Sequence, residues 1–237
     1  MSALDAIVVG AGPNGLAAAV TLARAGLAVR VYEKSVQLGG GARTAELTLP
    51  GYHHDVCSAV HPLAFESRFF REFGLTRRVD FAVPEASFAQ PLDGGRAAIA
   101  YRDLERTGAE LGRDGDAYVR LLRPLVERAS RVADFTGHPL LRVPPHPLTA
   151  AWFGVRALEQ GSVLWNARFR EDAAPALLTG VAAHTILSLP SLAAAGAGLA
   201  LTTYGHARGW PIPIGGSQRI VDAMADDLRE HGGEIVT

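Results

Sequence analysis

The sequence predicts an α/β fold: a Rossmann-type dinucleotide-binding domain that is interrupted by a largely helical segment. Near the N-terminus, an apolar run leads into glycines at G-x-G-x-x-G spacing, and a helical pattern and a second apolar run follow. A second glycine-rich turn occupies residues 38–44. Near the C-terminus, an amphipathic segment runs into residues 234–237, which again gives a helix followed by a strand. Alternating strands and helices of this kind are typical of a parallel sheet.

The first strand and turn are the most specific part of this pattern. The consecutive apolar residues 7–9 predict a strand that is buried on both faces. The turn that follows contains Gly10, Gly12 and Gly15, with Pro13 and Asn14 between the last two glycines. In such a turn one glycine bends the chain, one lets the backbone approach a pyrophosphate, and one lets the helix pack on the strand. The helix expected over residues 16–25 then offers free N–H groups to a phosphate.

The second strand, expected over residues 28–32, ends on an acid. Glu33 follows Gly15 by 18 residues, where a carboxylate can accept hydrogen bonds from an adenosine ribose. A carboxylate there disfavours NADP, because its 2′-phosphate would face a second negative charge. Glu33 does not distinguish NAD from FAD.

The second glycine-rich turn, LGGGART, favours a longer dinucleotide. A flavin–ribityl arm needs a second close backbone approach, and an arginine suits its diphosphate. Together with VVGAGPNGLAAAVTLARAG, VYEK, AELTLPGYHHDVCSAVHPL and GWPIPIGGSQRIVDAMADDLREHGGEI, this turn resembles the phytoene desaturase and flavin amine oxidase superfamily of FAD-dependent oxidoreductases. The resemblance is strongest to the phytoene-desaturase-related branch and covers residues 4–75 and 205–237. The chain departs from the amine-oxidase pattern at Gly41, where that pattern usually has an arginine.

The resemblance implies FAD as cofactor and dehydrogenation of a lipophilic, polyene-like substrate or an amine by hydride transfer to the flavin. Oxygen or a quinone would then reoxidise the flavin. The candidate cofactor-binding residues are Gly10, Gly12, Pro13, Asn14, Gly15, Glu33, Lys34, Gly39, Gly40, Gly41, Arg43 and His61. No catalytic acid or base is identified. An NAD-dependent dehydrogenase and a non-catalytic FAD-binding or interaction protein remain alternatives.

We expect three parts: a first FAD-binding part over residues 1–75, a substrate-domain segment over 76–209, and a return to the FAD-binding domain over 210–237. The strand expected at residues 234–237 has no later partner in the sequence. In the resembled family that strand lies near mid-chain, so we expect the N-terminal part of a longer protein. By itself such a part should retain FAD weakly and show no turnover.

The amino-acid composition limits the classes of binding partner that we expect. The 237 residues carry a net charge of −1 with a pI near 6.7, which gives no electrostatic footprint for nucleic acid. The N-terminus lacks the basic region of a signal peptide, so we expect a cytoplasmic protein. The family resemblance implies that its small-molecule substrate is hydrophobic. Peripheral membrane contact and homo-oligomerisation stay open. The single cysteine, Cys57, should be buried and inert.

Residues 176–205 contain no Asp, Glu, Lys or Arg. Thirty residues could span a bilayer, but proline, glycine and histidine interrupt the segment and alanine outnumbers leucine. Buried helices around a hydrophobic pocket are therefore the favoured interpretation.

His53, His54, Asp55 and His61 lie within nine residues of one another and raise the question of a metal site. Their spacing matches no zinc pattern, so we expect no metal and interpret them as loop residues at a cofactor cleft.

The remaining elements follow from periodicity and turn residues. We expect a strand over 45–50, a helix over 65–75, and a hairpin of 87–92 with 96–101 joined by Asp93-Gly94-Gly95. A helix should begin at Asp114 and kink at Pro124. A further helix should carry Leu148, Trp152, Val155 and Leu158 on one face, and the aromatic residues Trp152, Phe153, Trp165 and Phe169 should belong to the core. The last helix should bury Ile220, Met224 and Leu228 and end at Gly232.

Overall fold

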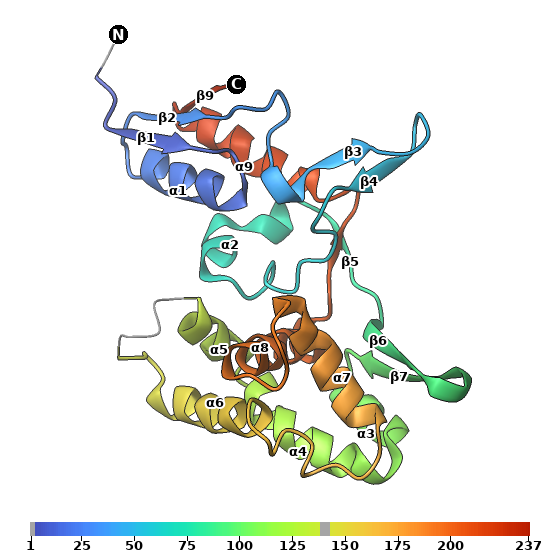
Figure 1. Cartoon of the computed structure of the whole chain (residues 1–237). Coiled ribbons are helices and arrows are strands. Elements are labelled where there is room, and N and C mark those ends of the chain that lie inside the picture. The colour runs from blue at the N-terminus through green and yellow to red at the C-terminus, as the bar shows by residue number, and fades with distance from the viewer. Residues whose placement is uncertain (1–2, 138–142) are drawn as a thin grey trace. The chain divides into compact units, whose positions relative to one another are not determined.

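The fold was analysed in a computed structural model that describes residues 3–137 and 143–237 (Figure 1). The chain divides into two compact units. Unit 1 comprises Met1–His61, Glu72–Ala82 and Ile212–Thr237, and unit 2 comprises Pro62–Arg71 and Val83–Pro211. Each unit is therefore built from segments that are far apart in the sequence.

Unit 1 is the α/β unit. Its elements are β1 (Ala6–Val9), α1 (Pro13–Arg24), β2 (Val29–Tyr32), β3 (Thr44–Glu46), β4 (His53–Asp55), β5 (Phe81–Ala82), β8 (Ile212–Pro213), α9 (Gln218–Glu230) and β9 (Glu234–Val236). β1, β2 and β9 form a parallel sheet in that order, β3 pairs with β4, and β5 pairs with β8, the last two pairs being antiparallel.

Both crossover connections of the parallel sheet run in the same direction, so α1 and α9 cover the same face of it (Figure 1). The two helices pack together through buried apolar side chains. These side chains are Leu16, Ala19, Val20 and Ala23 from α1, with Val221, Met224, Ala225 and Leu228 from α9. The inward face predicted for the last helix is confirmed.

The expectation that the first strand is buried on both faces is wrong for this structure. Ile7 is 59% exposed and Val9 is 85% exposed, and the neighbouring Tyr32 and Val236 are also exposed. The physical reason is the placement of both helices on one face. Alternate residues of each strand therefore point to a face that no described helix covers.

Three further expectations in this region need correction. The strand expected over 45–50 is shorter, because β3 ends at Glu46 and a turn at Gly51 leads into β4. His53 and His54 therefore belong to a strand and not to a loop. The helix expected over 65–75 is limited to α2 (Arg68–Phe73), since Gly74 adopts a left-handed conformation that ends it.

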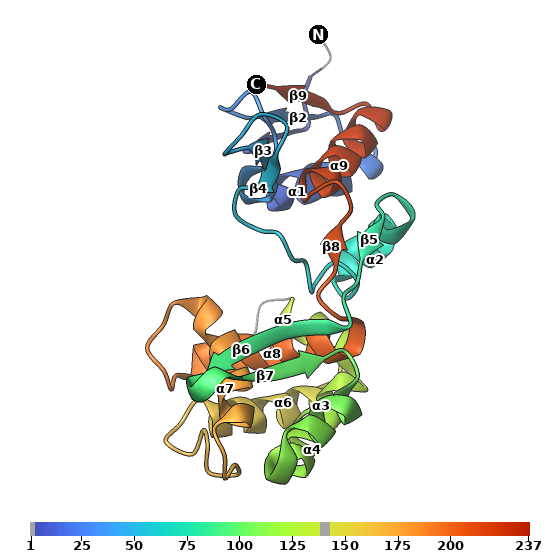
Figure 2. The same cartoon turned by 90° about the vertical axis from the view of Figure 1, so that its right-hand side faces the viewer.

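Unit 2 is largely helical, with one hairpin (Figure 2). Its elements are β6 (Ala86–Leu92), β7 (Arg96–Tyr101), α3 (Leu104–Glu110), α4 (Gly115–Val126), α5 (Ala129–Thr136), α6 (Pro147–Gln160), α7 (Ala173–Ala182) and α8 (Leu192–Arg208). The predicted hairpin is confirmed, with Leu92 opposite Arg96 across the turn at Asp93–Gly95. A continuous core forms from α4, α7 and α8, whose largest buried side chains include Tyr118, Leu122, Leu177 and Tyr204.

Two helix predictions in unit 2 differ from the structure. The helix expected to begin at Asp114 ends at Val126, and α5 starts separately at Ala129. In α6, the buried residues are Thr149, Phe153 and Ala157. The opposite face, with Leu148, Val155 and Leu158 at 87%, 55% and 60% exposure, points outward. Periodicity identified the helix, but apolar residues lie on both of its faces and the pattern selected the wrong one.

Of the four aromatic residues that we assigned to the core, Phe153 is buried and Phe169 packs against the core. Trp165 is half-buried, and Trp152 is 40% exposed. The charge-free segment 176–205 folds into parts of α7 and α8, which are mostly buried. No helix in the described ranges is both long and apolar enough to cross a membrane.

Asp227 of α9 ties the two helices of unit 1 together. Its carboxylate has no exposed surface and accepts hydrogen bonds from Arg24 of α1 and from Arg78. We predict that Asp227→Ala lowers the free energy of unfolding by about 2 kcal/mol. This is less than the usual loss for a fully buried pair, because both arginines can reach solvent. Asp226→Ala is the matched control, since Asp226 is 66% exposed and should change stability by less than about 0.5 kcal/mol. Equal losses in urea unfolding would contradict the role of Asp227.

Candidate dinucleotide-binding site

The site begins where β1 passes into α1. Gly10 has a φ of +97°, a conformation that side chains rarely adopt. Gly15 lies directly against this turn: a Cβ on Gly15 would stand 2.0 Å from the carbonyl oxygen of Gly10. Only glycine permits this contact, so the first turn of α1 can lie immediately beside the end of β1.

The N-terminus of α1 has free donors. Gly12 is the N-cap and provides no side-chain hydrogen bond to the helix, and Pro13 at the first helical position has no N–H. The amides of Asn14 and Gly15 lie in the first turn, where the helix supplies no acceptor. A Cβ on Gly12 would meet nothing nearer than the Cα of Gly40, at 4.0 Å. Free amides, the helix dipole and this space together suit an anionic phosphate group.

The second glycine-rich turn lies against the first. The amide of Gly39 donates to the carbonyl of Ala11 (2.9 Å), and a Cβ on Gly40 would stand 3.3 Å from the Cα of Gly12. Arg43 donates from Nε to the carbonyl of Gly40 (2.9 Å), so its guanidinium stays beside this turn. The two glycine motifs, 28 residues apart when measured from Gly12 to Gly40, therefore form one backbone surface.

Glu33 is oriented by the same turn. One carboxylate oxygen accepts the N–H of Ala11 (2.8 Å) and the other accepts the N–H of Ser35 (2.9 Å). These two hydrogen bonds lower the pKa of Glu33, so the side chain is a carboxylate at neutral pH. A carboxylate has about four acceptor positions, and two remain for a diol such as a ribose.

A hydrogen-bond network extends from the second turn to the start of α9. The amide of Ser58 donates to the carbonyl of Gly41 (3.0 Å), and Ser217 Oγ donates to the carbonyl of Ser58 (2.6 Å). Asp55 Oδ1 accepts from Thr44 Oγ1 (2.6 Å) and from the amide of Ser217 (2.8 Å). Residues near the beginning and the end of the chain thus position the same segment.

His61 belongs to this network. Its Nε2 lies 2.7 Å from Ser217 Oγ. Because the serine hydroxyl has one hydrogen and gives it to Ser58, Nε2 must carry the hydrogen of the pair and donate. Burial lowers the pKa of His61, against the opposing effects of the Asp55 charge and the Ser58 backbone, so the imidazole is neutral near pH 7.

The structure brings most of the predicted residues together, and two are peripheral. The glycines, Glu33, Arg43 and His61 are connected by the contacts above. Asn14 and Lys34 have exposed side chains at the margin of the site. Sequence reasoning missed Thr44 and Ser217 as positioning residues. Their signal in the sequence is weak, because Ser217 simply precedes the last predicted helix and its partner Asp55 is 162 residues away.

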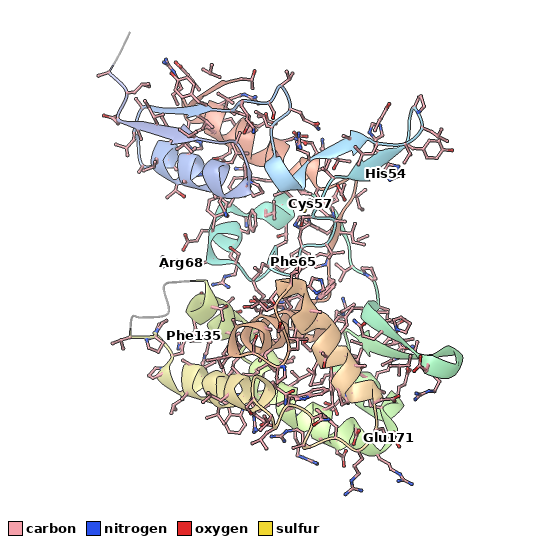
Figure 3. The ribbon with its side chains drawn as sticks, in the orientation of Figure 1. His54, Cys57, Phe65, Arg68, Phe135 and Glu171 are labelled. Carbon is pink, nitrogen blue, oxygen red and sulfur yellow. The ribbon has the colours of Figure 1, made fainter. Side chains whose placement is uncertain are left out.

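The structure corrects the expectations of a buried Cys57 and of a loop at His54 (Figure 3). Cys57 is exposed, contrary to the prediction of a buried thiol, because the short segment after β4 runs along the surface of the second turn. His54 projects from β4 and lies 2.8 Å from the hydroxyl of Thr48. Across residues 3–137 and 143–237, no group of three or more His, Cys, Asp or Glu side chains could hold a metal ion.

A parallel βαβ unit with a glycine turn at the helix N-terminus is typical of a Rossmann-like dinucleotide-binding domain, and comparison with known proteins agrees. Residues 8–73 match the family described as the NAD(P)-binding Rossmann-like domain. The chain is homologous to pyridine nucleotide-disulfide oxidoreductase domain-containing protein 2 of Rattus norvegicus, with 29% identity over 74% of this chain and 30% of that protein. The resemblance inferred from the motifs is therefore confirmed.

Two further similarities concern the whole chain. The uncharacterized protein Rv0897c of Mycobacterium tuberculosis is 27% identical over 98% of this chain and 47% of that protein. Putrescine oxidase, solved with putrescine bound, has a similar fold, with a TM-score of 0.54 and 22% identity over 98% of this chain and 50% of that one. The chain thus spans at most about half the length of these relatives.

We predict that Gly15→Ala and Gly12→Ala affect unit 1 very differently. Gly15→Ala places a methyl group against a backbone carbonyl and should cost about 3 kcal/mol of stability. Gly12 has an ordinary φ of −74° and open space beside it, so Gly12→Ala should change stability by less than about 1 kcal/mol. Thermal unfolding of both variants tests this, and similar melting temperatures would contradict the close approach.

A second prediction concerns pH. The pKa of His61 is lower in the folded state than its usual 6.5, so the unfolded state binds more protons just below pH 6.5. Stability contributed by neutral His61 is present above that pH and decreases as pH falls. Burial lowers the pKa of His206 in unit 2 to about 4, so His206 also makes the protein less stable as pH falls. The quantity to compare is therefore the pH dependence of the free energy of unfolding in the wild type and in His61→Gln. His61→Gln should reduce the loss of stability between pH 7 and pH 5, and an unchanged loss would contradict a buried neutral His61.

Proposed function

We propose that the chain is the dinucleotide-binding portion, with part of the substrate-binding portion, of an FAD-dependent oxidoreductase. Its substrate would be a lipophilic, polyene-like compound or an amine, with oxygen or a quinone as final acceptor. The observation that carries the proposal is the joined surface of two glycine turns beside the uncapped N-terminus of α1. One glycine turn suffices for a pyrophosphate, and the second turn extends the backbone surface in the way a longer dinucleotide needs.

Each residue has a role in this proposal. The amides of Asn14 and Gly15 would donate to the diphosphate, and Glu33 would accept from the adenosine ribose. Gly39 and Gly40 would let the backbone approach the cofactor, while the Arg43 guanidinium supplies positive charge beside that turn. FAD, when bound, supplies the hydride acceptor. His61, held neutral by burial and with its Nε2 hydrogen given to Ser217, would accept a hydrogen bond at Nδ1 without adding charge.

An NAD-dependent dehydrogenase is the second candidate, because the matching family is described as NAD(P)-binding. Glu33 disfavours NADP within that class, since its charge would oppose a 2′-phosphate. Titration distinguishes the two candidates: the 237-residue chain should bind FAD, seen as a change in the flavin absorbance bands, and should bind NAD at least about tenfold more weakly. Tighter binding of NAD would favour the second candidate.

We predict that Glu33→Ala weakens FAD binding by about 1.5–3 kcal/mol, because a charged acceptor is lost. Glu33→Gln retains an acceptor oxygen and the side-chain volume, so its loss should be smaller. Binding of riboflavin, which lacks the adenosine ribose, should be the same in both variants and the wild type. Unchanged FAD affinity in Glu33→Ala would contradict the ribose role.

A further inference from the structure

Unit 2 contains a cavity of about 230 Å³ that the dinucleotide site does not use. Residues of α7 and α8, the end of α6 and the loop before α8 line it. Leu178, Leu189 and Leu199 contribute branched apolar side chains, and Trp165 contributes an aromatic ring. This agrees with the pocket expected for the charge-free segment 176–205, which supplies most of the lining.

One polar group of the lining has no partner. Gln160, the last residue of α6, lines the cavity, and its Nε2 is buried without a hydrogen-bond acceptor among the described residues. A buried donor without an acceptor is unfavourable. Nε2 itself has almost no accessible surface, so it meets the cavity only when the amide of this half-buried side chain rotates, and an acceptor on a bound molecule would then remove the cost. The hydroxyl of Thr179, also in the lining, already donates to the carbonyl of Pro175 (2.7 Å).

The composition of the lining restricts the charge of a ligand. None of its lining residues in the described ranges carries a charge, so none of them would compensate an ammonium or a carboxylate for lost hydration. The volume restricts its size. An apolar cavity of about 150 Å³ holds benzene, so this one suits a molecule of about nine non-hydrogen atoms.

We propose that this cavity binds a small, neutral, apolar molecule that carries a hydrogen-bond acceptor, such as a carbonyl oxygen, with Gln160 Nε2 as the donor. The inference goes beyond the proposed function, because the site lies entirely in unit 2 and requires no flavin. Failure of FAD to bind would leave it untouched.

The 237-residue chain is titrated with acetophenone, isopropylbenzene and benzoate, which all have about nine non-hydrogen atoms and similar shapes. The readout is the ¹H–¹⁵N spectrum, in which the indole of Trp165 and the side-chain amide of Gln160 report on the cavity. The indoles of Trp152 and Trp210 do not line it and serve as internal controls. Acetophenone should shift the two reporters and benzoate should not. Equal shifts with benzoate, or shifts at the control indoles alone, would overturn the proposal.

Two comparisons of variants test the hydrogen-bond donor and the space in the cavity separately. Gln160→Met keeps the side-chain length and removes the donor, so it should weaken acetophenone binding about tenfold relative to isopropylbenzene. Ala195→Leu fills the cavity and should abolish binding of both, whereas Ala193→Leu places the same change on the exposed side of α8 and should have no effect. An unchanged ratio in Gln160→Met, or equal behaviour of the two alanine variants, would refute the site.

Discussion

The close approach of Gly15 to the carbonyl of Gly10 is the constraint on which the rest of unit 1 depends. A side chain at residue 15 would push the first turn of α1 away from the end of β1. The free amides of that turn would then lie farther from Glu33, whose carboxylate is held by the amide of Ala11 in the same turn. The contact therefore determines where the proposed phosphate donors and the proposed ribose acceptor lie relative to each other.

The site also depends on residues from the end of the chain. Ser217 and Gln218, at the start of α9, are hydrogen-bonded to Asp55 and Thr44, and the hydroxyl of Ser217 connects Ser58 to His61. Gly216 lies so close to Thr44 that a Cβ would stand 2.4 Å from its hydroxyl. The first 75 residues contain the glycine motifs but lack these contacts, so they do not form the complete site.

Sequence reasoning succeeded where the determinants are local. The glycine spacing, the acid after the second strand and the Asp93-Gly94-Gly95 turn each specify a short piece of backbone, and the structure contains those pieces. It failed where the outcome depends on distant partners. The role of Ser217 needs Asp55, the exposure of Ile7 depends on which face the helices cover, and the outward face of α6 depends on the packing of unit 2.

The central claim is that the N-terminus of α1 and the second glycine turn receive the diphosphate of FAD. The most direct measurement is the ¹H–¹⁵N spectrum of the 237-residue chain during separate titrations with FAD, ADP and riboflavin. The claim predicts that FAD and ADP both shift the amides of Gly12, Asn14 and Gly15, that FAD also shifts Gly40, and that riboflavin leaves the α1 amides unchanged. Unchanged α1 amides with FAD, or the same shifts with riboflavin as with ADP, would contradict it.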